Sequence, residues 1–372
     1  MKIGIDMSAL SKTVAGIGHY CIQIVKQIYA IDQENEYYLF APTEIDLPIE
    51  TNDHWHFINY GGEKGSALKF MTQLPCILKK LKIEVFVGTR HYFPPFNTEI
   101  RYIGVVHDLI PLYMPDLFTT FHKIRFRFFT WLCAKKADHI VAISKATAGD
   151  VMKYMHIPKE KISMVYNGVD ERFSLVRDEA GIRAAMEKYQ IKKPYVLCLS
   201  TVEPRKNMLR TIKAFEQLIT ERKMDYQLVI VGGNGWNNGE IYDYAKSHHM
   251  EESVIFTGYA SDDEIKHIYA NARAFVYVSL CEGFGIPIAE AMQSGTPVIT
   301  SNVSSMPEVA GEACELVDPY SVTAIKDAME KVLVDEALRE RMREKGIAQA
   351  AKFSWKKCAE ELWKIIVNLE GK

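Results

Sequence analysis

The sequence predicts an α/β protein with two doubly wound parallel sheets, one in each half of the chain. Short apolar runs rich in β-branched residues alternate with longer helical patterns, which is typical of parallel strands buried on both faces. The runs form two series, and a charged segment near residues 175–193 separates them. The chain has 372 residues, more than one hydrophobic core usually supports.

The apolar runs define the expected strands and domains. The first series reads "KIGID", "EVFVG", "YIGVVHD", "HIVAIS" and "ISMVYNG", and the second reads "YVLCLS", "QLVIVGG", "SVIFTG", "AFVYVS" and "PVIT". We expect a first domain over residues 1–185 and a second over 186–354. Residues 355–372 form a helical pattern that we expect to pack back on the first domain, through an apolar stripe of Trp355, Ala359, Leu362, Trp363 and Ile366.

Composition excludes several classes of protein. A formal net charge of −2 gives no basic field for gathering nucleic acid, so we expect no nucleic-acid partner. The seven cysteines are scattered without metal-binding spacing, as in a reduced cytosolic protein. We expect no secretory signal, because the N-terminus lacks a long apolar stretch, and no membrane span, because eighteen consecutive apolar residues occur nowhere.

The first candidate ligand loop is "AGIGHY", which follows the first expected strand. Gly16 and Gly18 can bring backbone amides close to a phosphate at the start of the next helix. A plain glycine-containing turn explains the same residues, because two glycines alone are a weak signal.

The second loop is "CLSTVEPRKNMLR" in the other half of the chain. A strand is expected to end near Leu199, and Arg205 and Lys206 come just before a helix that Asn207 could cap. Two cations beside a helix N-terminus favour binding of an anion such as phosphate. The alternative is an ordinary charged surface turn.

The third loop is "CEGFGIPIAEAMQSG", which holds Glu282 and Glu290. Pro287 is tolerated in a first helical turn, so the helix is expected to start beneath the "CEGFG" loop. Glycines let backbone amides approach a ligand, and the flanking carboxylates can accept hydrogen bonds from sugar or ribose hydroxyls. The alternative is that both glutamates only complement the helix dipole.

Two further stretches carry polar side chains. "GVVHDLIP" places His107 and Asp108 at the end of a strand, where a histidine either reaches a substrate or is structural. "SDDE" at residues 261–264 is expected to cap a helix. No acidic pair suited to a divalent ion stands at a strand end, so we infer no bound metal.

Residues 121–136, "FHKIRFRFFTWLCAKK", combine five cations with several aromatic residues. Such a helix could lie on an anionic bilayer that carries a lipid-linked acceptor. A core helix with one basic face explains the pattern equally well.

Several of these stretches together resemble the retaining glycosyltransferases of family 4, which have the GT-B fold. The resemblance covers nearly the whole chain and rests most on "CEGFGIPIAEAMQSGTPVI", "EPRKN", "VGGNGW", "FTGYASDDEIKHIYANARAFVYVS" and "PEVAGEACELVDP". It implies two Rossmann-like domains facing across a cleft. A nucleotide sugar would bind mainly to the second domain and the acceptor to the first.

The resemblance also implies roles for individual residues. Glu282 and the backbone of Gly283, Phe284 and Gly285 would lie near the donor sugar, and Glu290 would bind the ribose. Lys206 would hold the diphosphate, His107 would lie near the transferred sugar, and Gly16 and Gly18 would lie beside the phosphates. Many members carry a Gly-Arg pair where this chain has Ser200 and Thr201, so Arg205 is a candidate for the second positive charge.

We therefore expect a cytosolic, metal-independent hexosyltransferase that acts with retention and needs no cofactor. Similarity to bacterial mannosyltransferases of surface-polysaccharide assembly makes GDP-mannose the first expected donor and a growing, lipid-linked glycan the expected acceptor. Peripheral contact with the inner face of the membrane is a further expectation. The alternatives are a GT-B sugar-nucleotide epimerase and a non-catalytic nucleotide-sugar binding protein. An NAD-dependent dehydrogenase is disfavoured, because "VGGNGW" lacks the full GxGxxG spacing.

Overall fold

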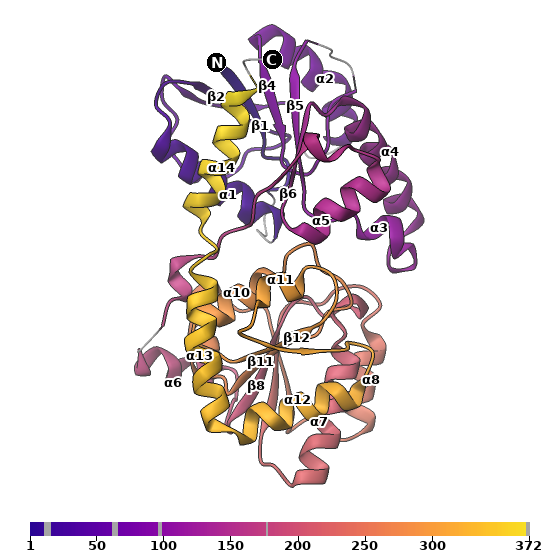
Figure 1. Cartoon of the computed structure of the whole chain (residues 1–372), viewed down its shortest axis with the longest axis vertical. Coiled ribbons are helices and arrows are strands. Elements are labelled where there is room, and N and C mark those ends of the chain that lie inside the picture. Colours follow the sequence, from indigo (N-terminus) through magenta and orange to yellow (C-terminus); the bar gives the residue numbers. More distant parts are fainter. Residues whose placement is uncertain (11–15, 62–65, 96–98, 176–177, 370–372) are drawn as a thin grey trace. The chain divides into compact units, whose positions relative to one another are not determined.

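The computed structural model describes residues 1–10, 16–61, 66–95, 99–175 and 178–369. The chain divides into two compact units (Figure 1). Unit 1 comprises Met1–Gly168 and Ser354–Lys372, and unit 2 comprises Val169–Phe353. The sequence placed this boundary at residue 185, which is too late, because helix α6 (Glu179–Lys188) packs on helix α9 (Asp262–Asn271) of unit 2.

In its described residues, unit 1 contains a seven-stranded sheet in which every pair of neighbouring strands is parallel. Long runs of buried aliphatic and aromatic residues form its central strands, as expected for a sheet covered on both faces. The spatial order is β3 (Trp55–Asn59), β2 (Glu36–Ala41), β1 (Lys2–Asp6), β4 (Val85–Gly88), β5 (Arg101–Val106), β6 (His139–Ala142) and β7 (Ile162–Met164).

Helices cover the sheet of unit 1. Phe70 of α2 and Phe129 of α4 belong to one core cluster with Phe86 and Tyr102 of the sheet. The C-terminal helix α14 packs beside α1, as Figure 1 shows, and buries all of its expected stripe except Trp363, which is half-buried and donates to Asp32 at 2.7 Å. The helices are α1 (Ile17–Ile31), α2 (Ser66–Leu81), α3 (Ile110–Tyr113), α4 (Thr120–Lys136), α5 (Lys145–Asp150) and α14 (Trp355–Asn368), with short helical turns at Pro115–Leu117, Val151–Met155 and Lys159–Lys161.

Unit 2 has a second parallel sheet, with six strands in the described part of the chain. Its order reverses between β8 and β11, which is where doubly wound sheets bind ligands. The spatial order is β10 (Val254–Gly258), β9 (Gln227–Val231), β8 (Tyr195–Leu199), β11 (Ala274–Tyr277), β12 (Val298–Ser301) and β13 (Glu315–Val317).

The helices of unit 2 bury apolar faces against this sheet. Phe215 of α7 and Met329 of α12 share a core cluster with Val196, Ile230 and Val276 of the strands. Besides α6 and α9, the helices are α7 (Met208–Arg222), α8 (Gly239–Ser247), α10 (Ile286–Gln293), α11 (Met306–Ala310), α12 (Val322–Val334) and α13 (Glu336–Ala350), with short turns at Glu171–Phe173 and Pro204–Lys206.

No helix among the described residues is both long enough and apolar enough to cross a bilayer.

Candidate functional site

The candidate site of unit 2 lies at the point where the strand order of the sheet reverses. Strands β8 and β11 are neighbours there, and each ends in a loop at the carboxyl edge. The loop after β8 leads to Arg205 and Lys206, and the loop after β11 leads to Glu282. These two loops are therefore positioned to act on the same ligand.

The loop after β8 closes in a 3₁₀ turn over Pro204–Lys206, and Asn207 then adopts a left-handed conformation with φ +61° before α7. The expected cap is wrong, since the side chain of Asn207 makes no cap hydrogen bond. Its amide instead donates to the carbonyls of Val278 at 3.0 Å and Pro319 at 2.7 Å. Asn207 thus ties the loop after β8 to the end of β11.

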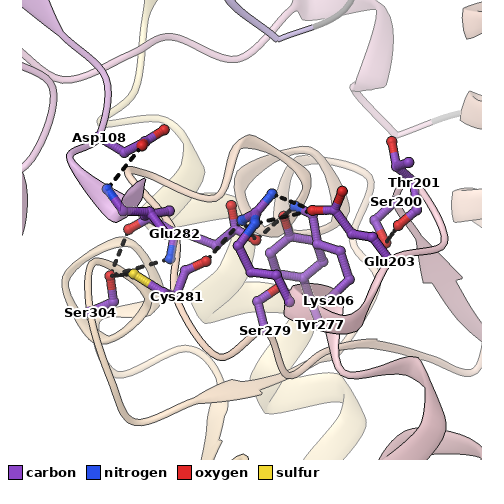
Figure 2. A network of polar contacts seen from close by, with 12 residues as sticks. Asp108, Ser200, Thr201, Glu203, Lys206, Tyr277, Ser279, Cys281, Glu282 and Ser304 are labelled. Atoms are coloured by element: carbon purple, nitrogen blue, oxygen red, sulfur yellow. Dashed lines mark hydrogen bonds and ion pairs between the residues drawn. The ribbon is translucent and has the colours of Figure 1, made fainter. Parts of the chain in front are cut away.

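Four charged side chains meet between these loops (Figure 2). Lys206 Nζ donates to Glu282 Oε1 at 2.7 Å and to the hydroxyl of Tyr277 at 2.7 Å. Arg205 lies 3.0 Å from the same Glu282 oxygen and 2.8 Å from Glu203, and it donates to the carbonyl of Cys281 at 2.9 Å. None of the four side chains is more than 16% exposed.

The charges of this cluster compensate one another. The two positive charges of Arg205 and Lys206 are balanced by the carboxylates of Glu203 and Glu282. Burial acts to raise the pKa of Glu282, but the adjacent Lys206 and Arg205 outweigh it and lower that pKa to about 2. Burial lowers the pKa of Lys206, against the opposing effect of Glu282. The cluster is therefore held together by charges that have little access to water.

The two cations differ in how firmly they are held. The guanidinium of Arg205 forms ion pairs with Glu203 and Glu282 and donates to a backbone carbonyl, so Arg205 links the two loops. Lys206 has one carboxylate partner and a phenol. A doubly charged anion that enters this edge of the sheet would compete with Glu282 for Lys206.

The loop from Glu282 to Gly285 is fixed by two serines that follow β12. Ser304 donates to the carbonyl of Glu282 at 2.6 Å, and Ser305 donates to the carbonyls of Glu282 and Phe284, each at 2.9 Å. Gly285 precedes α10 with φ +96°, a conformation that glycine adopts without strain. The helix then begins at Ile286 with Pro287 in its first turn, as the sequence predicted.

Glu290 lies one turn inside α10 and is apart from the ion cluster in its contacts. Its carboxyl accepts a hydrogen bond from Tyr269 at 3.2 Å. Burial raises the pKa of Glu290 to about 8 despite this bond, and the carboxylates of Asp262 and Asp170 contribute in the same direction. Glu290 is therefore largely protonated at neutral pH, and a neutral carboxyl can both donate to and accept from a hydroxyl.

This shift predicts a pH dependence of stability. The folded pKa of Glu290 is about 8 and the ordinary value is 4.5, so the folded state holds an extra proton between these values. The stabilisation that Glu290 contributes is therefore full below about pH 4.5 and is lost as pH rises from there through about 8. In Glu290→Gln, the free energy of unfolding should fall by roughly 1–3 kcal/mol less than in the wild type as pH rises. Melting curves at pH 5.5 and 8.5 should therefore show a smaller fall in Tm for the variant than for the wild type. Glu312→Gln, at an exposed position, is the control. If Tm falls by the same amount in Glu290→Gln and in the wild type, the raised pKa of Glu290 is contradicted.

Unit 1 carries the other predicted residues. Gly16 precedes α1 with φ +49°, and Gly18 is buried in the first turn of that helix. His107 follows β5, is buried, and donates from Nε2 to the carbonyl of Thr89 at 2.8 Å. Tyr20 of α1 packs edge-on against His107 with ring centroids 4.8 Å apart, so the start of α1 and His107 are neighbours.

The environment of His107 makes its imidazole neutral. Burial lowers the pKa of His107 to about 4, against the hydrogen bond to Thr89. A neutral imidazole held by a backbone carbonyl supplies packing and hydrogen bonding without a charge. Ala15, the first residue of the "AGIGHY" motif, lies outside the described residues.

Four residues of the site were not predicted from the sequence: Glu203, Tyr277, Ser304 and Ser305. Glu203 stands in the "EPRKN" stretch two positions before Arg205, so an acidic residue beside the cations was a usable signal. Tyr277 and the two serines carried no such signal in the sequence. They come close to the site only because β8, β11 and β12 pair with one another. An acidic residue of the stretch at 261–264 caps α9, as expected: Glu264 forms a capping box with Ser261.

No group of three or more metal-ligating side chains occurs in the ranges that the structure describes. Ser200 and Thr201 stand where many family members carry a Gly-Arg pair, so Arg205 is the candidate for the second positive charge near Lys206. Its guanidinium contacts Glu203, Glu282 and the carbonyl of Cys281.

Both halves of the chain match the profiles of known protein families. The profile described as "Glycosyltransferase Family 4" matches residues 14–173, and "Glycosyl transferases group 1" matches residues 182–349. O-antigen chain mannosyltransferase B of Escherichia coli is 29% identical over 384 residues, which cover 97% of this chain and 98% of that relative. The serotype-specific mannosyltransferase WbdA of Escherichia coli is 34% identical over 372 residues, but they cover 95% of this chain and only 44% of WbdA.

Among solved structures, sucrose-phosphate synthase from Thermosynechococcus elongatus superimposes with a TM-score of 0.80 at 17% identity, over 99% of this chain and 98% of that one. At that identity the likeness concerns the fold, which is GT-B. The relatives do not favour the epimerase alternative. The chain belongs to the family 4 and group 1 glycosyltransferases of the GT-B fold, and it is a glycosyltransferase.

Proposed function

We propose that this glycosyltransferase moves mannose from GDP-mannose to a growing, lipid-linked glycan, with retention at the anomeric carbon and without a metal or other cofactor. The observation that carries the proposal is the match along nearly the full chain to an O-antigen chain mannosyltransferase. The transfer of mannose would take place in the cytoplasm, at the inner face of the membrane where such an acceptor is anchored.

The ion cluster supports a diphosphate donor. We assign Lys206 to the diphosphate, and Glu282 with the backbone of Gly283, Phe284 and Gly285 to the sugar. When the diphosphate binds Lys206, the carboxylate of Glu282 loses one of its two cations and becomes available to sugar hydroxyls. We assign the neutral carboxyl of Glu290 to the ribose hydroxyls.

The transfer itself balances without a further reactant. The bond between the anomeric carbon and the diphosphate oxygen breaks, and the acceptor hydroxyl oxygen bonds to that carbon on the same face. The hydroxyl proton passes to the departing diphosphate. Lys206 stabilises the negative charge that develops on the leaving group, and Glu282 stabilises the positive charge that develops on the sugar. The roles of Gly16 and Gly18 beside the phosphates and of His107 near the transferred sugar stay predictions.

A thermal-shift screen tests the donor. GDP and GDP-mannose are compared with UDP, ADP and UDP-glucose, each at several concentrations. A ligand at 100 times its Kd stabilises the folded protein by about 2.7 kcal/mol, so the preferred base should raise Tm most. Stabilisation by uridine compounds alone would contradict GDP-mannose, and transfer with inversion, read by NMR of the product linkage, would contradict retention.

Activity is expected to survive chelation, because Lys206 and the amides at the start of α10 provide positive charge for the diphosphate. Initial rates are measured in EDTA and after adding back Mg²⁺ or Mn²⁺. A rate within about two-fold of the untreated enzyme is expected. Complete loss in EDTA that only a divalent ion restores would show that the site needs a metal.

A further inference from the structure

Helix α4 has a second apolar face that the core of unit 1 does not use. Its inner face is buried through Phe126, Phe129 and Leu132. The opposite face leaves four large apolar side chains open to solvent, which we call the α4 outer stripe: Phe121 is 75% exposed, Ile124 66%, Phe128 40% and Trp131 56%.

These four residues form one continuous line. Their spacings of three, four and three positions put them on the same side of a helix with 3.6 residues per turn. The stripe runs over ten positions, or about 15 Å at 1.5 Å per residue. The rings of Phe128 and Trp131 lie 6.4 Å apart, centroid to centroid. Exposed apolar residues scattered singly need no explanation, but such a row on one helix marks an interaction surface.

Positive charge borders the stripe. Arg125 and Arg127 are both exposed, and at 100° per residue they fall on opposite sides of the stripe. Lys135 is exposed one turn beyond Trp131. These three cations form no ion pair with another residue in the described ranges. The helix contains no aspartate or glutamate.

We propose that the α4 outer stripe docks in the plane of an anionic lipid bilayer. Large apolar side chains enter the boundary between headgroups and acyl chains, and the flanking arginines contact anionic headgroups. Tryptophan and phenylalanine suit that boundary. A protein partner or a second copy of the chain would have to bring matching acidic residues, whereas anionic lipid supplies them everywhere. The choice of a membrane rests on the proposed lipid-linked acceptor, because docking would hold unit 1 where that acceptor lies.

Vesicle flotation with the full chain tests the docking. Vesicles of neutral phosphatidylcholine are compared with vesicles that also contain phosphatidylglycerol, at low and at physiological salt. Binding is expected with the anionic vesicles and should weaken as salt rises. Phe121→Ser/Trp131→Ser should weaken binding at least ten-fold, and Arg125→Ala/Arg127→Ala should weaken it about thirty-fold.

Matched controls come from unit 2. Val334 is 65% exposed on α12, and Arg341 and Lys345 are exposed on α13. Val334→Ser and Arg341→Ala/Lys345→Ala should bind vesicles as the wild type does, and melting curves confirm that every variant folds. Absence of binding to anionic vesicles at low salt would overturn the proposal, as would binding that the α4 variants leave unchanged. A wild-type dimer in solution that Phe121→Ser/Trp131→Ser converts to a monomer would also overturn it, in favour of a second copy.

The docking can fail separately from the proposed function. A water-soluble glycan acceptor requires no membrane, so the α4 variants should transfer mannose to it at the wild-type rate. If that transfer succeeds and no vesicle binding occurs, the docking is wrong and the proposed function stands. If vesicles are bound and no glycan accepts mannose, the proposed function is wrong and the docking stands.

Discussion

Replacing Lys206 by alanine is expected to lower kcat/KM for the donor by about 10²- to 10³-fold. The ammonium group lies 2.7 Å from both Glu282 and the hydroxyl of Tyr277, at the point where the strand order of the sheet reverses. Loss of one positioned donor to a developing negative charge costs enzymes about this much. Steady-state kinetics with varied donor and a saturating glycan acceptor measure the effect.

The loss has a structural part that a second variant can separate. Lys206→Ala leaves Glu282 facing Arg205 alone, and a half-compensated buried carboxylate is costly. Lys206→Ala/Glu282→Gln removes both charges, so Tm should recover toward the wild-type value while activity stays low. Lys206→Arg keeps the charge and should retain more activity than alanine, and exposed Lys246→Ala should match the wild type. Recovery of activity along with Tm in the double variant would show that Lys206 acts only on stability.

The elements that were predicted correctly are those whose structure depends on local chemistry. The start of α10 is one example, because Gly285 and Pro287 permit few alternatives to a turn followed by a first helical turn. Helix α14 is another, because its apolar residues recur at helical spacing. The ten strands that were expected are all present, since buried parallel strands leave continuous apolar runs.

Three strands were missed for identifiable reasons. Strand β2 carries two tyrosines beside a glutamate, β3 mixes aromatic and polar residues, and β13 has three residues. Each of these becomes a strand by pairing with a neighbour, and that pairing is a tertiary effect.

The neutral ion cluster could not be predicted from local sequence. Lys206 and Glu282 are 76 positions apart, and their contact depends on the adjacency of β8 and β11. Asn207 illustrates the same limit, because a residue typical of a helix cap bonds instead to carbonyls 71 and 112 positions away. Residue types indicated the site, and the pairing of strands determined which charges meet.

Glu282→Gln is expected to change catalysis and ligand binding in opposite directions. The carboxylate can stabilise positive charge on the sugar as the diphosphate leaves, so its loss should lower kcat about ten- to hundred-fold. The same carboxylate occupies Lys206 at 2.7 Å before any anion binds. Its neutralisation frees that cation, so GDP alone should bind up to about ten-fold more tightly.

Glu290→Gln provides the contrast, because Glu290 contacts Tyr269 and takes no part in the ion cluster. A residue that binds the ribose equally in ground and transition states affects the donor KM and leaves kcat nearly unchanged when it is replaced. Kinetics with varied GDP-mannose and calorimetric titration with GDP measure both variants, and melting curves verify that each is folded. If Glu282→Gln binds GDP more weakly than the wild type, then Glu282 does not compete for Lys206, and the exchange of partners that we assign to the cluster is wrong.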